Sequence, residues 1–450
     1  MPTSTKQLFV FANLDGDWAP CGRLELTEDG SEVMASNFAY GLRYLERGNA
    51  IEVDPVSLSL NDRAAVREKM LFPANGLPVF GSIRDAAPDA WGRRVIEAKL
   101  KVPANSLPES QYLLHAGSDR VGALDVRQTL QDAPRPGLAT WNSLQYLVEA
   151  AERIEEGRQI PANLEMIFQD GTALGGARPK ASIRDEEEVL WLAKFSSRND
   201  AFNIPMVECC ALRLASEAEL TVPPLQYITL GTRPVMLIRR FDRFWATPEA
   251  TAAAPLPDDL MATAPVAGLV EKRMPFASGL TLLGCDESES RTKSYGDLAG
   301  AIRRYCHPAV IRDDNRQLFS RMVYNIFVSN DDDHLRNHGF LWDLRLRGWR
   351  LSPLYDVLPR PSVAFERQLH LGVGPQGRAA TLDNAFAARE MFTLSPADAA
   401  SAIATMWAKV REWRVYFESY GATPEQIDRV APAFRHIDDV STPELRRSLP

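Results

Sequence analysis

The chain has 450 residues, 45% hydrophobic and 24% charged, which is enough to bury a large core in two or three domains. Its formal net charge of −8, from 51 basic and 59 acidic residues, argues against unaided nucleic-acid binding through a broad basic face. Five cysteines without a CxxC pair indicate a reduced, cytoplasmic protein, and no apolar run reaches the ~18–20 residues of a membrane span.

The first 130 residues alternate short strands, turns and helices, which predicts an α+β region. A polar stretch at 1–6 leads directly into a strand, so we expect no signal peptide. Strands are expected at 7–13 and 21–26 around an Asp15-Gly16 turn, and at 122–126. Strand or extended structure is expected at 38–45 and 53–60, and helices near 91–96 and 110–116. We find no catalytic constellation in this region.

A glycine-rich stretch follows an amphipathic helix predicted at 143–156. Glycines let backbone amides approach an anion closely, and Arg178 and Lys180 add positive charge. The stretch lacks the Gly-Lys-Ser/Thr ending of a Walker loop and does not match GxGxxG. A phosphate-binding loop and a plain turn fit it equally well. Its residues are Thr172, Ala173, Leu174, Gly175, Gly176, Ala177, Arg178, Pro179 and Lys180.

The next segment predicts a β-hairpin, with strands at 181–184 and 189–195 joined by an acidic turn. Lys194 lies late in the second strand among apolar neighbours, and a buried lysine needs an anionic partner. The helix expected at 205–217 offers Glu208 in its first turns. In a kinase such a lysine pairs with nucleotide phosphate and a helix glutamate. The competing interpretation is a lysine at a strand end that reaches water.

A second hairpin, with strands at 225–230 and 234–239, leads into a charged segment. Arg240, Phe241 and Asp242 lie where a two-lobed nucleotide enzyme has its hinge, after the last strand of the small lobe. A charged strand end is the alternative. Residues 245–268 are rich in Ala and Pro without periodicity, which predicts a surface loop.

The remaining chain is mostly helical, with helices expected at 295–305, 314–328, 396–417 and 424–434. After the helix at 314–328 comes Asn-Asp-Asp-Asp-His-Leu-Arg-Asn, in which Asp332 and Asn337 have the spacing of a kinase catalytic loop. Asp356, between apolar residues after a predicted strand at 349–351, supplies a second metal ligand of the kind such a loop needs. The alternative is a capping loop of solvated acids.

The order of glycine-rich loop, strand lysine, helix glutamate, hinge, Asp-x4-Asn and later Asp resembles the HipA family of bacterial serine/threonine kinases. These are the toxin half of HipA–HipB toxin–antitoxin pairs. The resemblance rests on Leu-Gly-Gly-Ala-Arg-Pro-Lys at 174–180, Asn-Asp-Asp-Asp-His-Leu-Arg-Asn-His at 330–338 and Ser-Pro-Leu-Tyr-Asp-Val at 352–357. Pro-Asp-Ala-Trp-Gly-Arg at 88–93 is similar to the family's amino-terminal region.

The resemblance implies an α+β, two-lobed protein-kinase-like fold. Its parts would be an amino-terminal α/β subdomain at 1–130, a small lobe at 131–244 and a mostly helical lobe at 245–450. It also implies the site. Asp332 would be catalytic with His334 in support, and Asn337 and Asp356 would hold Mg²⁺. The implied ATP contacts are Thr172, Ala173, Leu174, Gly175, Gly176, Ala177, Lys180, Lys194, Glu208, Arg240, Phe241, Asp242 and His334.

The family further implies a toxin that phosphorylates an aminoacyl-tRNA synthetase, such as glutamyl-tRNA synthetase, and so stops translation. Its partner would be a small helix-turn-helix antitoxin, and DNA would be reached only through that partner. Family members often carry an autophosphorylated Ser in the phosphate loop, but Ala173 stands there in this chain. Either Thr172 replaces it or the switch is absent. A small-molecule or lipid kinase and a non-catalytic nucleotide-binding partner of an antitoxin are the alternative functions.

Overall fold

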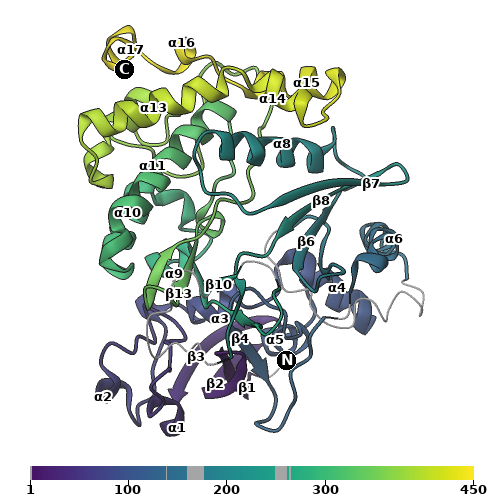
Figure 1. Cartoon of the computed structure of the whole chain (residues 1–450). Helices are drawn as coiled ribbons and strands as arrows, with labels where there is room; N and C mark the ends of the chain where they lie inside the picture. The colour runs from purple at the N-terminus through teal and green to yellow at the C-terminus, as the bar shows by residue number, and fades with distance from the viewer. Residues whose placement is uncertain (1–2, 138, 160–176, 249–260, 263–264) are drawn as a thin grey trace.

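The structure, a computed structural model, describes residues 3–137, 139–159, 177–248, 261–262 and 265–450. The amino-terminal strands lie at the bottom of Figure 1 and the carboxyl-terminal helices at the top, so the two ends of the chain are far apart. The expected loop residues Thr172 to Gly176, and a short helix expected at 161–168, lie outside the described residues.

The amino-terminal region is built on a four-stranded antiparallel sheet with the order β3-β2-β1-β4. The β1–β2 hairpin closes at Asp15 and Gly16, both with positive φ, which is the turn chemistry predicted from the sequence. Buried side chains of this sheet form one core with residues such as Phe80 and Leu341 from later parts of the chain. The strands are β1 (Ser4–Leu14), β2 (Asp17–Asp29), β3 (Glu32–Tyr40) and β4 (Leu124–Arg127).

Two expectations for this region need correction: the strand expected at 38–45 is present only to residue 40, and the piece expected at 53–60 is not a strand. The strand β3 ends at Tyr40, and residues 42–45 form the short helix α1 (Leu42–Leu45), whose Tyr44 hydroxyl donates to the carbonyl of Ile51 at 2.6 Å. Residues 53–60 form a turn, because the Asp54 carboxylate accepts from two backbone amides just ahead of it, at 2.8 Å each. The other helices here are α2 (Arg63–Val66), α3 (Gly81–Asp85), α4 (Ala90–Leu100) and α5 (Glu109–His115).

A second antiparallel sheet, with the order β5-β6-β8-β7, forms the middle of the chain. The two hairpins predicted here are present, and Lys194 faces Lys180 across the β5–β6 pair. The helix α6 (Leu144–Glu155) packs its apolar stripe on β5, and Trp91 of α4 joins the same core. The strands are β5 (Lys180–Arg184), β6 (Leu190–Phe195), β7 (Leu225–Leu230) and β8 (Arg233–Arg239).

Two small sheets connect this region to the helical part of the chain. Their orders are β10-β9-β11 and β12-β13-β14. The first begins at Arg243, so part of the expected surface loop at 245–268 is strand. The strands are β9 (Arg243–Ala246), β10 (Met261–Ala262), β11 (Val270–Arg273), β12 (Phe276–Ser278), β13 (Gly339–Asp343) and β14 (Gly348–Leu351).

The carboxyl-terminal part is helical, as predicted. In Figure 1, α8 lies between the β7–β8 hairpin and the helices at the top, and the Tyr324 hydroxyl donates to the carbonyl of Ala211 on α8 at 2.6 Å. The helices are α8 (Ile204–Glu217), α9 (Gly279–Leu283), α10 (Tyr295–Tyr305), α11 (Ile311–Val328), α12 (Leu382–Ala387), α13 (Pro396–Val410), α14 (Trp413–Ser419), α15 (Pro424–Val430), α16 (Ile437–Val440) and α17 (Pro443–Ser448).

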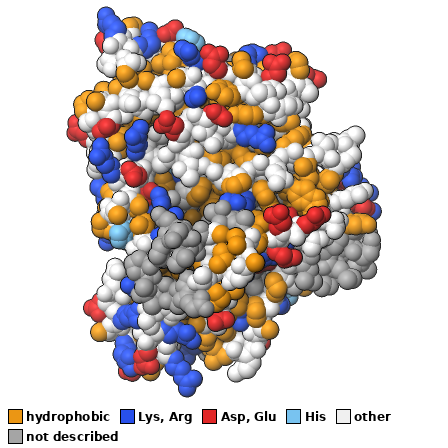
Figure 2. Space-filling view, viewed as in Figure 1, with side chains coloured by type: hydrophobic (Ala, Val, Ile, Leu, Met, Phe, Trp, Pro, Cys, Tyr) orange, Lys and Arg blue, Asp and Glu red, His pale blue; other side chains and the backbone are white. Residues whose placement is uncertain are grey.

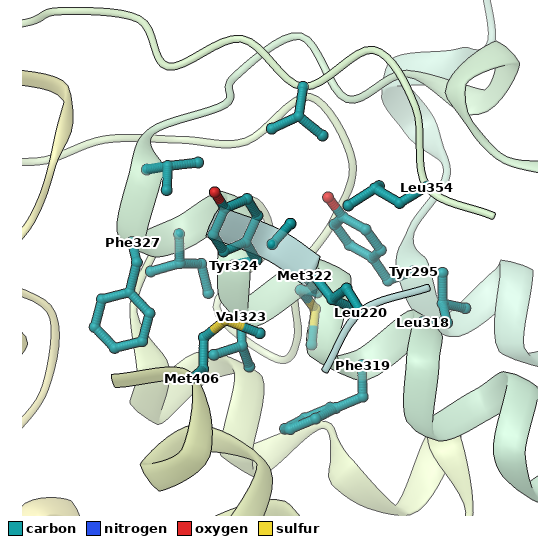
Figure 3. Close-up of a cluster of buried hydrophobic side chains, with 14 of the residues drawn as sticks. Leu220, Tyr295, Leu318, Phe319, Met322, Val323, Tyr324, Phe327, Leu354 and Met406 are labelled. Carbon is teal, nitrogen blue, oxygen red and sulfur yellow. The ribbon is translucent and has the colours of Figure 1, made fainter. Parts of the chain in front are cut away.

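The helix α11 is the centre of this core. From Leu318 to Val328 it buries side chains on all sides, which is typical of a helix surrounded by other elements. Figure 3 shows Phe319, Met322, Val323 and neighbouring apolar side chains packed against residues from other segments. Because α11 is held on every face, the polar loop after its last residue starts from a fixed point.

All five cysteines are buried and free, in agreement with the composition. Within the parts of the chain that the structure describes, no helix combines the length and apolar character needed to cross a membrane.

The position of Phe319 at the centre of this core predicts a large stability effect. The variant Phe319→Ala should lose about 3–5 kcal/mol of unfolding free energy, since it removes a fully buried aromatic side chain and leaves a cavity. Val415→Ala is the control, because Val415 is 62% exposed and its truncation should change stability by about 0.5 kcal/mol or less. Urea unfolding followed by tryptophan fluorescence measures both, and equal losses would contradict the assigned core.

Candidate active site

Three segments meet at the side chain of Lys194. The Nζ atom of Lys194, on β6, lies 2.5 Å from Oε1 of Glu208 on α8 and 2.7 Å from Oδ1 of Asp356 after β14. Asp356 is 162 residues away in sequence and has a positive φ of 60°, which is uncommon for a residue with a side chain. The predicted strand lysine, helix glutamate and later aspartate are thus in direct contact.

The charges of this triad support one another. Burial alone opposes the charge on Lys194, but Asp356 and Glu208 raise the pKa of its ammonium group above the ordinary value. Burial also acts to raise the pKa of Asp356, but the Lys194 ammonium lowers it to about 2. At Glu208 burial dominates, and the pKa lies above its ordinary value despite Lys194. Asp356 is 44% exposed, so a ligand can reach its carboxylate.

The acidic loop after α11 is held by one buried carboxylate. Helix α11 ends at Ser329 in the left-handed conformation, and the chain then turns through 330–334 into a 3₁₀ turn (Leu335–Asn337). The Asp333 carboxylate accepts from the Tyr295 hydroxyl at 2.6 Å and the Asn325 amide at 2.7 Å, and lies 3.0 Å from Nε2 of His338. Asp333 and His338, which had no role in the sequence interpretation, therefore form the support of the loop.

Asp332 faces outward on this support. Its carboxylate is 53% exposed and lies 2.6 Å from the Arg360 guanidinium, which also pairs with Asp331 at 3.3 Å. The Asn337 side-chain amide donates to the main-chain carbonyl of Asp332 at 3.1 Å. The Asp332–Asn337 interval that the sequence singled out is thus a turn closed by a hydrogen bond between its two ends.

A cavity of about 170 Å³, which we call the Lys194 cavity, lies beside these residues. Of the eleven predicted site residues that the structure describes, seven line it, whereas Glu208, Asp332, Lys180 and Ala177 do not. His334 lines it, and the Nδ1 atom of His334 has no hydrogen-bond partner among the described residues. Its lining residues are Asp85, Val121, Leu192, Lys194, Ile238, Arg239, Arg240, Phe241, Asp242, Phe276, Ser278, His334, Arg336, Asn337, Tyr355 and Asp356.

The predicted hinge is a buried ion-pair network. The Asp242 carboxylate lies 2.6 Å from Arg240 and 2.7 Å from Arg243, and these arginines hold the pKa of Asp242 well below its usual range against the opposing effect of burial. Arg240 also donates to the carbonyls of Asp119 and Arg120 in the amino-terminal region. The charges of Arg240 and Asp242 are therefore engaged within the protein, and Phe241 contributes an aromatic wall.

Lys180 differs from the role expected of it. Its amine is buried and lies 3.0 Å from the carboxylate of Asp89, which caps the amino terminus of α4. Burial lowers the pKa of Lys180 and raises that of Asp89, and each group partly offsets the effect of burial on the other. Ala177 is exposed at the first described position after the gap, and Thr172, Ala173, Leu174, Gly175 and Gly176 lie outside the described residues.

Sequence reasoning missed the contribution of the first 130 residues. Asp85 lines the Lys194 cavity and accepts from the Ser278 and Thr281 hydroxyls at 2.7 and 2.6 Å, while Arg336 lies 4.0 Å away. Asp89 pairs with Lys180 across 91 residues. Asp89 caps the amino terminus of α4, and Asp85 is the last residue of α3, so neither position carries a local sign of its distant partners.

The oxygen atoms of this site fit one kind of metal. Among the described residues no group of three or more His, Cys, Asp or Glu side chains is placed to hold an ion. Asn337 and Asp356 both line the Lys194 cavity, and because Nδ2 of Asn337 is engaged by Asp332, its amide oxygen remains for a ligand. One carboxylate and one amide oxygen suit Mg²⁺ when phosphate and water supply the other ligands.

Comparisons with known proteins agree with this architecture. The family model described as HipA-like C-terminal domain matches residues 172–414. A chain from the HipA, HipB and operator DNA complex of the Shewanella oneidensis MR-1 toxin–antitoxin system is 15% identical, with a TM-score of 0.62 over 99% of this chain and 96% of that chain. The Helicobacter pylori proinflammatory kinase CtkA is 14% identical, with a TM-score of 0.40 over 58% of this chain and 86% of that one. No curated protein sequence matches. The fold class predicted from the sequence is confirmed.

The buried carboxylate of Asp333 predicts a stability effect with a defined pH dependence. Asp333→Ala should cost about 3–5 kcal/mol at pH 7, because it leaves buried donors without their acceptor. Burial acts to raise the pKa of Asp333, but His338 and the Tyr295 hydroxyl hold it below its ordinary value. The contribution is therefore full above pH ~4 and lost as the pH falls through the lower folded-state value.

Thermal unfolding of wild type and variant between pH 7 and pH 3 measures this effect. The gap in melting temperature should narrow below pH ~4. Asp331→Ala is the matched control, since Asp331 is half-exposed and its removal should change stability by about 0.5 kcal/mol or less. A gap that stays constant down to pH 3 would contradict the assigned role of the Asp333 carboxylate.

Proposed function

The chain belongs to the HipA family, and from this premise we propose that it is an ATP- and Mg²⁺-dependent protein serine/threonine kinase that acts as the toxin of a type II toxin–antitoxin pair. The observation that carries the proposal is the contact of Lys194 with both Glu208 and Asp356 beside Asn337, at the edge of one cavity. This is the charge arrangement that phosphoryl transfer needs, since the reaction depends on positioning and on neutralising phosphate charge.

The nucleotide would bind in the Lys194 cavity. Lys194 would donate to the ATP phosphates, while Glu208 keeps its ammonium group in place from the α8 side. Phe241 and Ile238 offer apolar walls for the base, and the paired charges of Arg240 and Asp242 hold this segment rigid. The loop from Thr172 to Ala177 would cover the phosphates, and His334 would support the loop that carries Asp332.

The transfer step would use the exposed carboxylate of Asp332. It would orient the substrate hydroxyl and accept its proton as the hydroxyl oxygen bonds to the γ-phosphorus of ATP, while the bond from that phosphorus to the β–γ bridging oxygen breaks and ADP leaves. Arg360 would release the Asp332 carboxylate when substrate binds. Asn337 and Asp356 would hold Mg²⁺, which supplies charge neutralisation on the phosphates when bound. Because the buried Asp333 carboxylate anchors the loop to α11, Asp332 would keep its orientation during phosphoryl transfer.

The substrate and partners are proposed from the family. The substrate would be an aminoacyl-tRNA synthetase, such as glutamyl-tRNA synthetase, in the cytoplasm, and the inhibitor a HipB-like helix-turn-helix antitoxin that reaches DNA. Figure 2 shows basic and acidic side chains mixed over the visible face, and the net charge is −8. Both features fit a protein that meets DNA through a partner. Because Ala173 has no hydroxyl, either Thr172 would take the phosphate of self-inactivation or this chain would lack that switch.

The central prediction concerns Asp332. Asp332→Asn should lower phosphoryl transfer by about 10²–10⁴-fold and relieve growth arrest, because the amide cannot accept the proton. Labelling of a cell lysate with γ-phosphate-labelled ATP measures transfer, and protein bands are expected rather than labelled small molecules. Asp331→Asn, its exposed neighbour that also pairs with Arg360, should keep most of the activity. Full growth arrest by the Asp332 variant, with normal folding, would overturn the assignment.

A second prediction separates nucleotide binding from stability at Lys194. Lys194→Met should weaken ATP binding at least about tenfold and lower the melting temperature, because Glu208 is left buried without its cation. The double variant Lys194→Met/Glu208→Gln should recover the melting temperature without recovering ATP binding. Calorimetric titration and thermal unfolding check the two parts, and recovery of ATP binding in the double variant would contradict the role of Lys194.

A further inference from the structure

A second cavity adjoins the segment 239–241 from which the Lys194 cavity is also built. It has a volume of about 490 Å³, and we call it the Arg321 cavity. Arg239, Arg240 and Phe241 line both cavities. The wall also includes Ser352 and Pro353, four and three residues before Asp356. No part of the proposed kinase chemistry uses this cavity.

The Arg321 cavity is strongly cationic. Among the described residues six arginines line it, against two carboxylates, those of Asp314 and Asp343. Four of the arginines have acidic partners. Arg240 and Arg243 pair with Asp242, while Arg345 pairs with Asp343 and Arg350 with Asp314. Arg239 and Arg321 are the two cavity arginines without an acidic partner among the described residues.

Arg321 is the decisive residue. Its side chain, on α11, is 1% exposed, and its guanidinium donates from Nη2 to the main-chain carbonyl of Ser352. Its Nε and Nη1 atoms have no hydrogen-bond partner in the described part of the chain. Burial lowers the pKa of Arg321 to about 10, so the group stays charged at neutral pH. A buried guanidinium group with unpaired N–H donors lowers the stability of the fold unless an anion accepts their hydrogen bonds.

Arg239 adds a second cation with unused donors. It is the last residue of β8 and is partly buried, and burial is the cause of a pKa below the usual range for arginine. Its guanidinium makes no ion pair with a described carboxylate. Apolar side chains such as Phe244, Met274 and Leu341 form other parts of the wall. Two guanidinium groups beside an apolar surface match a dianion attached to an apolar body.

We propose that the Arg321 cavity is a binding site for a small phosphate monoester with an apolar or aromatic body, separate from the nucleotide site. The phosphate would accept from Nε and Nη1 of Arg321 and from Arg239, and the apolar body would lie against Phe244 and Met274. Because Arg321 holds the carbonyl of Ser352, and Phe241 faces both cavities, the ligand would contact the two segments that position Asp356 and the hinge. The proposal stands on these contacts and does not depend on the proposed kinase activity.

The test uses phenyl phosphate as the probe and calorimetric titration of the full chain. Wild type should bind phenyl phosphate more tightly than inorganic phosphate or benzoate, since only the first combines a dianion with an apolar body. Arg321→Met and Arg239→Gln should each weaken binding by about tenfold or more, because each removes charge-assisted hydrogen bonds. Lys194→Met, which removes the cation of the Lys194 cavity, should leave the affinity for phenyl phosphate within about twofold.

A separate measurement guards against misfolding. Without ligand, Arg321→Met should melt at or above the temperature of wild type, because it removes a buried charge with unmade hydrogen bonds. If that variant fails to fold, Arg239→Gln, at a partly exposed position, decides the question. Binding that survives both arginine variants but is lost in Lys194→Met would overturn the proposal, as would no binding at all. Equal affinity for benzoate and phenyl phosphate would overturn the assignment of a phosphate.

Discussion

A buried ammonium group must be neutralised, and at Lys194 this requirement organises the site. Its two carboxylate partners come from α8 and from the segment after β14, so one ion-pair triad joins the central sheet to the helical part of the chain. Burying the Lys194 ammonium group would destabilise the fold unless both of its carboxylate partners were present. The triad therefore couples correct packing of the two regions to the arrangement of the groups proposed to meet phosphate and metal.

In the acidic loop after α11, two neighbouring aspartates, Asp332 and Asp333, differ in burial and therefore in role. Asp333 is buried and holds the loop through donors from α10, from α11 and from the loop itself. Asp332, one residue earlier, stands in solvent with its carboxylate against Arg360. The same side chain thus serves as a buried anchor in one position, whereas in the other its exposed carboxylate is the group we propose to accept the substrate's proton, because only the first is removed from water.

The buried arginines of the hinge and of the Arg321 cavity differ in how many acceptors surround their guanidinium groups. At Asp242 one carboxylate pairs with the guanidinium groups of Arg240 and Arg243, and main-chain carbonyls of the amino-terminal region accept further hydrogens from both. Of these two side chains, only Nε of Arg243 lacks a hydrogen-bond partner among the described residues. At Arg321 a single carbonyl accepts, and two donor atoms remain without a partner in the described structure. A buried arginine with a carboxylate partner and several acceptors stabilises the fold, whereas one with a single acceptor and no carboxylate beside a cavity indicates a place for a ligand.

The sequence by itself determined the local features: the hairpins of the central sheet, the long apolar helix α11, the Asp332–Asn337 interval and the candidate partners Lys194, Glu208 and Asp356. These features arise from periodicity, turn chemistry and short spacing, which act within a few residues. Tertiary structure decided the rest. Asp89 reaches Lys180, and Asp85 lines the Lys194 cavity, because such contacts depend on burial and on chain segments some 90 or more residues apart. Burial likewise leaves two donor atoms of Arg321 without a partner in the part of the chain that the structure describes. The periodicity of a sequence does not predict which distant charged residue will pair with a buried charged group.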